Sequence, residues 1–429
     1  MAGGCPRWRR ESSQERQIQG QLNDGGFIPP SVFQGGAVNS LKAILISLVV
    51  LATAVSGSAE TQRHVTPHVE KVDQLLESAI ARGLVTGGVV LVGNRQGVLF
   101  EKAYGRGLGG PDSPGLTVDS LFDIASLTKV VATTPAVLKL AEERKLSLVD
   151  PVVRWFPEFS GKGKDDLLVL NLLTHTSGLD DFSLSSVNPL QSAIEGAAHQ
   201  RLKGEVGNRF RYADINFILL GELVRRASGV GLQEFVANRF YGPLAMRDTG
   251  FSPDPAKAFR CAATRGAENQ LLQGQVQDYP ARQLGGVAGH AGLFTTIHDL
   301  ARFCRMILNE GELGDVRVLS ERAVRQMTVP YFSRGGDVMR GLGWDIASPF
   351  SSPKGEGFSR YSFGHTGYSG SSIWIDPASD TFVVLLTSRV DYGRTKEFSR
   401  LRGDLSTLAA SLFAATQKEF AGVVRDTDE

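Results

Sequence analysis

Strand-forming segments lie towards both ends of this 429-residue chain, and a long helical stretch separates them. Two apolar runs within residues 89–100, joined by a Gly-containing turn, predict a hairpin, and two more within 372–387 predict a second strand pair. Residues 125–309 show helical patterns and few strand signals. A sheet assembled from both ends of a chain forms only together with the insert between them. We therefore expect one cooperative unit, with a cleft where the sheet and the helical part meet.

Helical spacing of apolar residues continues outside the predicted strands. It runs over residues 69–80 before the first pair and over 398–412 after the last, and a further helix is predicted at 217–227, ended by Gly229. The sequence thus predicts an α+β fold, in which an antiparallel sheet flanked by terminal helices stands beside an all-α subdomain. Within a catalytic domain of residues 60–429, the sheet part comprises about 60–124 and 310–429, and the helical part about 125–309.

The charge of the chain is almost balanced, with 46 Lys and Arg against 45 Asp and Glu, and no block of like charges occurs. Such a chain has no long-range field to attract a polyanion, so nucleic acid is not expected as a partner. Only Cys5, Cys261 and Cys304 are present, which excludes a disulfide framework. Cys261 and Cys304 could form one bridge in an exported chain, or remain two buried thiols.

Residues 1–59 contain the features of a signal peptide. Lys42 precedes an apolar segment at 43–55, which is too short to span a bilayer comfortably but typical of an h-region. Small residues follow, so cleavage after Ala59 would leave a mature chain beginning at Glu60. We therefore expect an exported protein, periplasmic or extracellular. The alternative is an uncleaved segment that anchors the protein in the membrane.

Two Ser-x-x-Lys sequences occur, and their surroundings differ. Ser126 and Lys129 precede an apolar run that continues to Leu140, so a helix would hold the hydroxyl and the amine on one face. Burial against such a run would lower the pKa of the amine and make it a usable base. Ser351 and Lys354 instead lie in a loop rich in Ser, Pro and Gly, where no helix is expected. The first pair is therefore the candidate nucleophile and base.

A tyrosine could complete a proton-transfer set around this pair. Tyr212 leads into the helix predicted at 217–227. Its phenol could exchange a proton with Ser126 if Lys129 stabilised the phenolate. Taken alone, a tyrosine in this position is more often a packed aromatic residue.

Two further segments contain histidine among small residues. Residues 364–370 hold His365 and three glycines, which would let the backbone approach a ligand and leave N–H groups free for an oxyanion. Residues 172–179 hold His175 between helical segments. We expect His175 to support a turn rather than to act in catalysis.

Together these motifs resemble those of the serine β-lactamase and penicillin-binding protein superfamily, nearest to class C β-lactamase-like serine hydrolases. The similarity covers residues 69–413, and its markers, in family order, are Phe122–Lys129, Leu172–Leu179, Tyr212, Gly289–Phe294 and Gly364–Gly367. The resemblance implies a β-lactamase/transpeptidase-like fold. It also implies that Ser126 is acylated, that Lys129 and Tyr212 transfer its proton, and that the N–H groups of Ser126 and Tyr368 form the oxyanion hole.

The chain departs from the family pattern at two positions that would contact substrate. Asp214 stands where the second motif usually has Asn, so a carboxylate replaces an amide that could hold a substrate carbonyl. His365, followed by Thr366 and Gly367, stands where lactamases usually have Lys. A neutral imidazole near pH 7 lacks the charge that clamps a substrate carboxylate. Both changes suit a peptidase or an esterase at least as well as a lactamase.

Other catalytic motifs are absent or out of context. The Gly-x-Ser-x-Gly elbow of α/β-hydrolases and the Walker A loop do not occur. Residues 105–110 match a dinucleotide-binding pattern, but Pro111 and Pro114 follow where a helix would have to begin. No zinc-binding spacing is present, and His290 and His298 are expected to be structural. We therefore predict neither a metal nor an organic cofactor.

The sequence thus predicts an exported serine hydrolase that works through an acyl-enzyme on Ser126. The expected substrates are D-Ala-type peptides, peptidoglycan fragments among them, β-lactams and small esters. The alternative is a non-hydrolytic penicillin-binding sensor or scaffold, which is acylated and then stays blocked. We expect a monomer with no partner besides its substrate.

Overall fold

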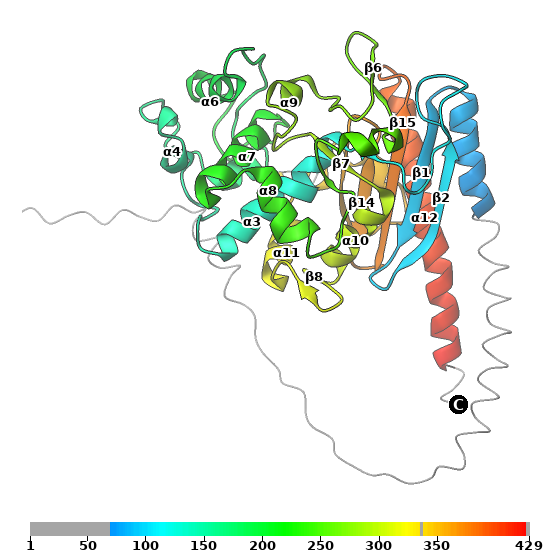
Figure 1. Ribbon diagram of the computed structural model, residues 1–429. Helices are drawn as coiled ribbons and strands as arrows, with labels where there is room; N and C mark the ends of the chain where they lie inside the picture. Colours follow the sequence, from blue (N-terminus) through cyan, green and yellow to red (C-terminus); the bar gives the residue numbers. More distant parts are fainter. Residues whose placement is uncertain (1–68, 335–337, 426–429) are drawn as a thin grey trace, which may run out of the picture. The chain divides into compact units, whose positions relative to one another are not determined.

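The computed structural model describes residues 69–334 and 338–425, the last fourteen of them by their backbone alone (Figure 1). The predicted leader, with its h-region at 43–55 and its cleavage site, lies outside these residues. Within the described ranges no helix is both long enough and apolar enough to cross a membrane.

An eight-stranded antiparallel sheet forms the framework, in the order β10-β11-β12-β13-β14-β15-β1-β2. Strand β1, from the N-terminal part, pairs along its length with β15, the last strand of the chain. This confirms the predicted sheet made from both ends, although the sequence signals did not show β10 to β13. The strands are β1 (Val85–Gly93), β2 (Val98–Gly105), β10 (Phe332–Arg334), β11 (Val338–Arg340), β12 (Asp345–Ala347), β13 (Phe363–Thr366), β14 (Ser372–Asp376) and β15 (Thr381–Arg389).

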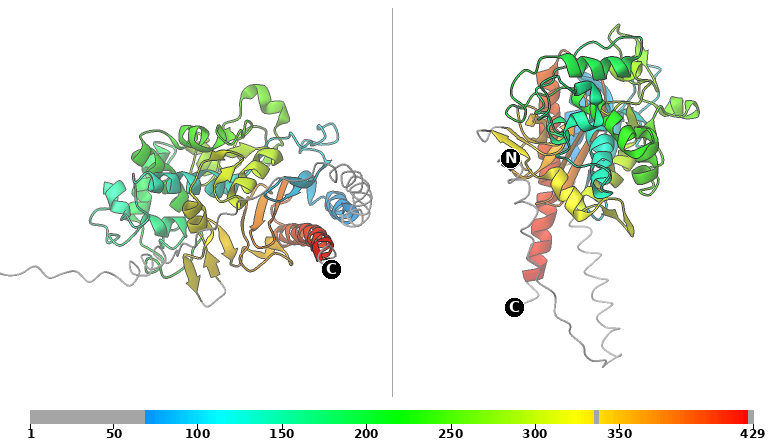
Figure 2. Two further views of the ribbon diagram at one scale, coloured as in Figure 1. Left: turned by 90° about the horizontal axis from the view of Figure 1, so that it is seen from below. Right: turned by 90° about the vertical axis from the view of Figure 1, so that its left-hand side faces the viewer.

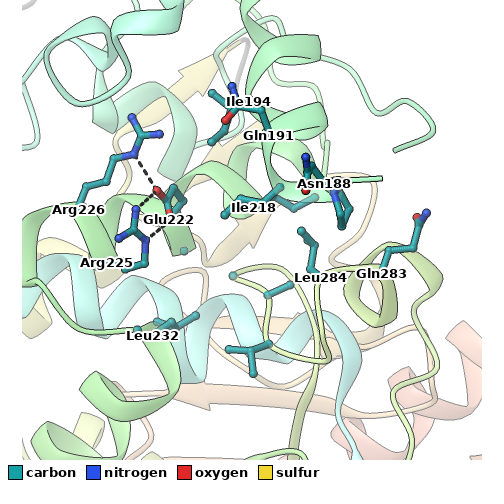
Figure 3. Close-up of a pocket in the computed structure, with 17 residues that line it drawn as sticks. Asn188, Gln191, Ile194, Ile218, Glu222, Arg225, Arg226, Leu232, Gln283 and Leu284 are labelled. Carbon is teal, nitrogen blue, oxygen red and sulfur yellow. Dashed lines mark hydrogen bonds and ion pairs between the residues drawn. The ribbon is translucent and has the colours of Figure 1, made fainter. Parts of the chain in front are cut away.

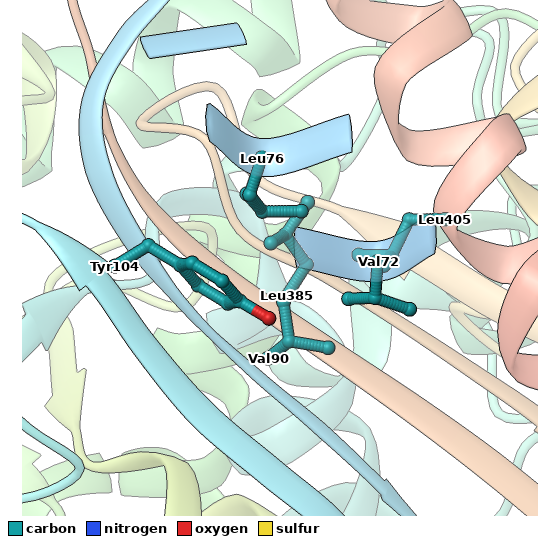
Figure 4. Close-up of a cluster of buried hydrophobic side chains, with 6 residues drawn as sticks. All are labelled: Val72, Leu76, Val90, Tyr104, Leu385 and Leu405. Atoms are coloured by element: carbon teal, nitrogen blue, oxygen red, sulfur yellow. The ribbon is translucent and has the colours of Figure 1, made fainter. Parts of the chain in front are cut away.

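Two terminal helices, one over residues 69–81 and the other α12 (Thr395–Arg425), cover one face of this sheet (Figure 2). Figure 4 shows the contact: Val72 and Leu76 of the first helix meet Leu385 of β15 beside Leu405 of α12. These side chains are at most 1% exposed. Burial of each such aliphatic side chain contributes about 1.5–3 kcal/mol, so this cluster holds both ends of the domain on the sheet.

The helical part lies on the other face, where α10 contacts β1 and β15. Its central helix, α7, runs from Ile215 to Ser228 and ends at Gly229 with φ 84°, close to the prediction. The other helices are α3 (Thr134–Glu142), α4 (Val152–Trp155), α5 (Val169–Leu173), α6 (Pro189–His199), α8 (Leu232–Val236), α9 (Tyr279–Gln283), α10 (Ile297–Leu308) and α11 (Glu321–Thr328), with short helical turns η1 (Ala125–Leu127), η2 (Lys129–Thr133), η3 (Pro157–Phe159), η4 (Ala237–Tyr241), η5 (Pro255–Arg260) and η6 (Ser352–Lys354).

Short strands also occur within the helical part and at its borders, and the apolar patterns of the sequence did not predict them. β3 (Phe122–Asp123), β7 (Leu293–Thr295) and β4 (Gly250–Phe251) form a small sheet, and two-stranded ribbons are made by β5 (Thr264–Arg265) with β6 (Leu271–Leu272) and by β8 (Glu312–Leu313) with β9 (Val316–Arg317). Cys261 and Cys304 are separate buried thiols, which is the second of the two alternatives considered for them.

Candidate active site

Ser126 lies at a sharp turn that follows β3. Ala125, just before it, has φ 46°, a left-handed conformation that costs energy in a residue other than glycine. The buried carboxylate of Asp123 supports this turn, because its oxygens accept the N–H of Ala125 at 2.8 Å and that of Gln277 at 2.7 Å. Burial raises the pKa of Asp123 to about 6. Sequence reasoning missed Asp123, although an acidic residue flanked by Phe122 and Ile124 is a signal of a buried carboxylate.

The segment after Ser126 is not the continuous α-helix that the sequence predicted. The 3₁₀ turn η1 contains Ser126, and the π-helical turn η2 contains Lys129 before α3 begins. π turns of this kind often occur at functional sites. The predicted proximity of hydroxyl and amine is nevertheless present, since Lys129 Nζ lies 3.0 Å from Ser126 Oγ.

The second Ser-x-x-Lys sequence does not form such a pair. Ser351 Oγ donates to the carboxylate of Asp345, and Lys354 Nζ lies 3.4 Å from the carbonyl oxygen of Ile346. The expected loop also contains the short 3₁₀ turn η6. The sequence context therefore identified the Ser-x-x-Lys sequence in which the hydroxyl and the amine meet. The second sequence nevertheless contains a short helical turn.

Lys129 is completely buried, and its ammonium group is surrounded by acceptors. Besides Ser126, Nζ donates to the backbone oxygen of His290 at 3.0 Å and lies 2.7 Å from Asp214 Oδ1. Burial is the largest single influence and lowers the pKa of Lys129, but Asp214 and Tyr212 together raise it by more, so the pKa lies above its ordinary value. The prediction of a lowered pKa is therefore wrong. It considered only the apolar neighbours in sequence and could not place Asp214 beside the amine.

Tyr212 reaches the same point from the segment before α7. Its ring stacks on the ring of His175, with centroids 4.4 Å apart, and Lys129 Nζ lies 5.1 Å from the centroid of the Tyr212 ring. The side chains of Lys129 and Ser126 are near enough to the phenol to lower its pKa. Burial raises the pKa of Tyr212 and outweighs the effect of Lys129, so the phenol is favoured over the phenolate near neutral pH. His175 is buried, with φ 55°, and burial lowers its pKa well below the ordinary value. The neutral ring of His175 thus supports both a turn and Tyr212.

Asp214, expected beside the substrate, instead forms the ion pair with Lys129. Oxygens of Asp214 and Asp278 and a ring nitrogen of His290 lie within 4.8 Å of one another, a donor set that could hold a cation. The ammonium of Lys129, 2.7 Å from Asp214, already supplies a positive charge there. His290, expected to be structural, holds this cluster through a 2.7 Å contact from Nε2 to Asp278.

The third motif stands on β13 and the loop that follows it. His365 Nδ1 lies 2.9 Å from the backbone oxygen of Thr366, so Nδ1 donates and Nε2 is left as an acceptor. Burial, helped by the charge of Arg340, lowers the pKa of His365 well below the ordinary value, so the imidazole is neutral at pH 7. The next residues are Gly367 and Tyr368, whose side chain is exposed. Within the described residues, the N–H of Tyr368 has no acceptor.

A cavity of about 60 Å³ adjoins these groups, and its lining comprises Tyr212, Arg340, Asp345, Phe350, His365, Thr366 and Trp374. Phe350 comes from the Ser-, Pro- and Gly-rich loop that contains the second Ser-x-x-Lys sequence, and its ring centroid lies 5.8 Å from that of Tyr212. A larger cavity, of about 630 Å³, lies between α6, α7 and the turn after α9 (Figure 3). Ser126, Lys129 and Tyr212 do not line it, and at its wall Glu222 is bonded to both Arg225 and Arg226 (Figure 3).

Comparisons with known proteins give the family. The model of the Beta-lactamase family matches residues 72–404. A Bacillus subtilis (strain 168) protein named N-acetylmuramyl-L-alanine amidase is 30% identical over 404 residues, which cover 85% of this chain and 88% of that protein. An Escherichia coli (strain K12) protein provisionally named D-alanyl-D-alanine carboxypeptidase is 28% identical over 403 residues, 81% of this chain and 91% of its own.

Solved structures show the same fold. EstCE1, described as a hydrolase with promiscuous acyltransferase activity, matches 80% of this chain and 99% of its own with a TM-score of 0.68 at 22% identity. A penicillin-binding protein homologue from Pyrococcus abyssi matches 75% of this chain and 73% of its own with a TM-score of 0.61 at 22% identity. The predicted β-lactamase/transpeptidase-like fold is confirmed, and the chain belongs to the Beta-lactamase family and is a hydrolase of its serine type.

Proposed function

We propose that the protein is an exported acyl hydrolase that forms an ester intermediate on Ser126. The observation that carries this proposal is the contact of the Ser126 hydroxyl with an ammonium, Lys129, at 3.0 Å, and with the phenol of Tyr212. A hydroxyl between two groups that can exchange protons is the arrangement that activates a serine nucleophile. The apolar segment at 43–55 supports the proposal of export.

The ion pair with Asp214 suggests how the serine loses its proton. Asp214 is the nearest acceptor for the proton of Lys129, and although the ion pair favours the ammonium, transfer of this proton gives a small population of neutral amine 3.0 Å from Ser126 Oγ. That amine takes the hydroxyl proton as oxygen attacks the substrate carbonyl, and the phenol of Tyr212 then protonates the leaving group. The N–H groups of Ser126 and Tyr368 would bind the oxyanion that forms.

The groups that line the small cavity favour an uncharged substituent of the substrate at this position. His365 is neutral, and the guanidinium of Arg340 is paired with Asp345 at 2.9 Å. A cavity of about 60 Å³ leaves room for a small substituent, such as the methyl group of a D-Ala residue. D-Ala-type peptides, small esters and β-lactams remain the proposed substrates, and the names of the amidase and carboxypeptidase relatives support the first of these.

Substitution of Ser126 tests the proposal. Hydrolysis of nitrocefin, a D-Ala-D-Ala peptide and p-nitrophenyl butyrate should be lost in Ser126→Ala and nearly lost in Lys129→Ala, because both residues act in one unit. Lys354→Ala, in the second Ser-x-x-Lys sequence, is the matched control and should keep the parent rate. Hydrolysis by Ser126→Ala at a rate near that of the parent would refute the proposal.

Penicillin labelling of the parent protein distinguishes a hydrolase from the non-hydrolytic sensor. A fluorescent penicillin should label Ser126 and then be released as product, with the label decaying over repeated turnovers. Label that stays bound, without product and without hydrolysis of any of the three substrates, would mean a penicillin-binding sensor.

A further inference from the structure

The loop of residues 367–371 is tied to the turn that carries Ser126. Ser369 Oγ donates to the backbone oxygen of Asp123 at 2.6 Å, and Ser371 Oγ donates to that of Ile124 at 2.9 Å. Both bonds are buried. The two backbone segments that would supply the oxyanion hole, one at Ser126 and the other at Tyr368, are therefore fixed relative to each other.

Two arginines support this loop from behind. Arg402 of α12 donates through Nη2 to the carbonyl oxygens of Gly367 at 2.6 Å and Ser371 at 2.7 Å. Arg389, at the end of β15, donates through Nη1 to the carbonyl of Tyr368 at 3.3 Å. The ring of Phe398 contacts both guanidinium groups, at 4.6 Å from Arg389 and 4.5 Å from Arg402.

In the described part of the chain, neither guanidinium group has a carboxylate within ion-pair distance. Both arginines are buried, with 4% and 7% exposure, and their hydrogen bonds go to backbone oxygens. A buried charge without a counter-charge is costly, because backbone carbonyls only partly replace its hydration. The two guanidinium groups therefore create a positive electrostatic potential behind the loop of residues 367–371.

The geometry of one peptide unit connects Arg402 to the cleft. The carbonyl of Gly367 and the N–H of Tyr368 belong to the same peptide bond, and no peptide bond in the described chain is cis. In a trans peptide these two groups point in opposite directions, so a guanidinium on the carbonyl orients the N–H away from α12. The hydrogen bond also polarises the peptide and makes its N–H a stronger donor.

We propose that Arg402 is a positioning residue of the oxyanion hole, which fixes and polarises the Tyr368 N–H through the Gly367 carbonyl. This inference rests on the proposed acyl transfer at Ser126, because only that reaction develops a negative oxygen at this place.

A pair of esters that differ in one atom tests the inference. In a thionoester, sulfur replaces the carbonyl oxygen, and because sulfur is larger and a weaker acceptor, it gains less from a well-placed N–H donor. Loss of an oxyanion-hole donor typically lowers kcat by about 10²–10³; because Arg402→Met leaves the donor in place without its support, we expect a loss of about tenfold. The loss should fall on kcat for the oxygen ester, with KM little changed and thionoester hydrolysis slowed less.

The ratio of the two rates is the decisive quantity. The rate for the oxygen ester divided by that for the thionoester should fall severalfold, though by less than tenfold, in Arg402→Met. It should recover in part in Arg402→Lys, which keeps the charge, and stay at the parent value in Arg400→Met, which removes an exposed charge from the same helix. Poor folding lowers both rates of one sample equally and leaves the ratio unchanged. A parent-like ratio in Arg402→Met would overturn the inference, whereas hydrolysis by Ser126→Ala would overturn the proposed function itself.

Discussion

Asp214→Asn should slow acylation at neutral pH and make its rate depend on pH. The substitution restores the amide usual in the second family motif and removes the carboxylate that lies 2.7 Å from Lys129 Nζ. The amine stays completely buried, with Ser126, Tyr212 and the carbonyl of His290 as its partners. Burial, which favours the neutral amine, is then no longer offset by a counter-charge.

The size of the change follows from the exposure of the two groups. Removing one partner of a buried ion pair costs about 3–5 kcal/mol. Lys129 is fully buried, but a third of the Asp214 side chain is exposed, so water screens part of the interaction and we expect about 1.5–3 kcal/mol. At about 1.4 kcal/mol per unit, the pKa of Lys129 should fall by about one to two units.

The pH profile of acylation between pH 6 and 10 detects this fall. Acylation by the parent should be nearly independent of pH up to about pH 9, because Asp214 takes the proton of Lys129, whereas acylation by Asp214→Asn should rise with pH as a growing fraction of Lys129 loses its proton. The exposed Asp404→Asn is the control, and superimposable pH profiles for Asp214→Asn and the parent would refute the reasoning.

Two further predictions concern the supports of the site. The pKa of Asp123 is raised to about 6, so acylation by the parent should slow below pH 6, where the protonated carboxyl no longer accepts both N–H groups. The stability of the parent should fall as pH rises from about 4 to 6, because the folded state binds more protons there than the unfolded state. Stopped-flow acylation and urea unfolding of Asp123→Asn should show neither dependence. A β-carbon at Gly289 would lie 2.0 Å from the Phe217 carbonyl, so Gly289→Ala should lose about 1–3 kcal/mol in urea unfolding; Gly204→Ala, with open space around it, should not.

The parts of the fold that the sequence predicted are those with long periodic patterns. The hairpin β1–β2, the pair β14–β15 and helix α7 each contain enough apolar residues to show a period. Strands β3, β4 and β7 have two or three residues, which is too few for a period, and they form only because the surrounding chain brings them together.

The sequence likewise predicted only those parts of the candidate site that lie in local motifs. Ser126, Lys129 and Tyr212 lie in local motifs, and the structure brings all three together. The pKa of Lys129 could not be predicted, because it depends on a carboxylate from a distant segment. Arg402 left a weaker signal, a cation beside Leu401 on the apolar side of a predicted amphipathic helix.

The pairing of β1 with β15 has a consequence for the synthesis of the protein. Val90 pairs with Leu385, so the contact order is high and no N-terminal fragment contains the complete sheet. A nascent chain on the ribosome keeps one edge of β1 unpaired until almost the whole polypeptide has been made. A stop codon before β15 would therefore give an aggregation-prone product without activity, even though Ser126, Lys129 and Tyr212 would all be translated.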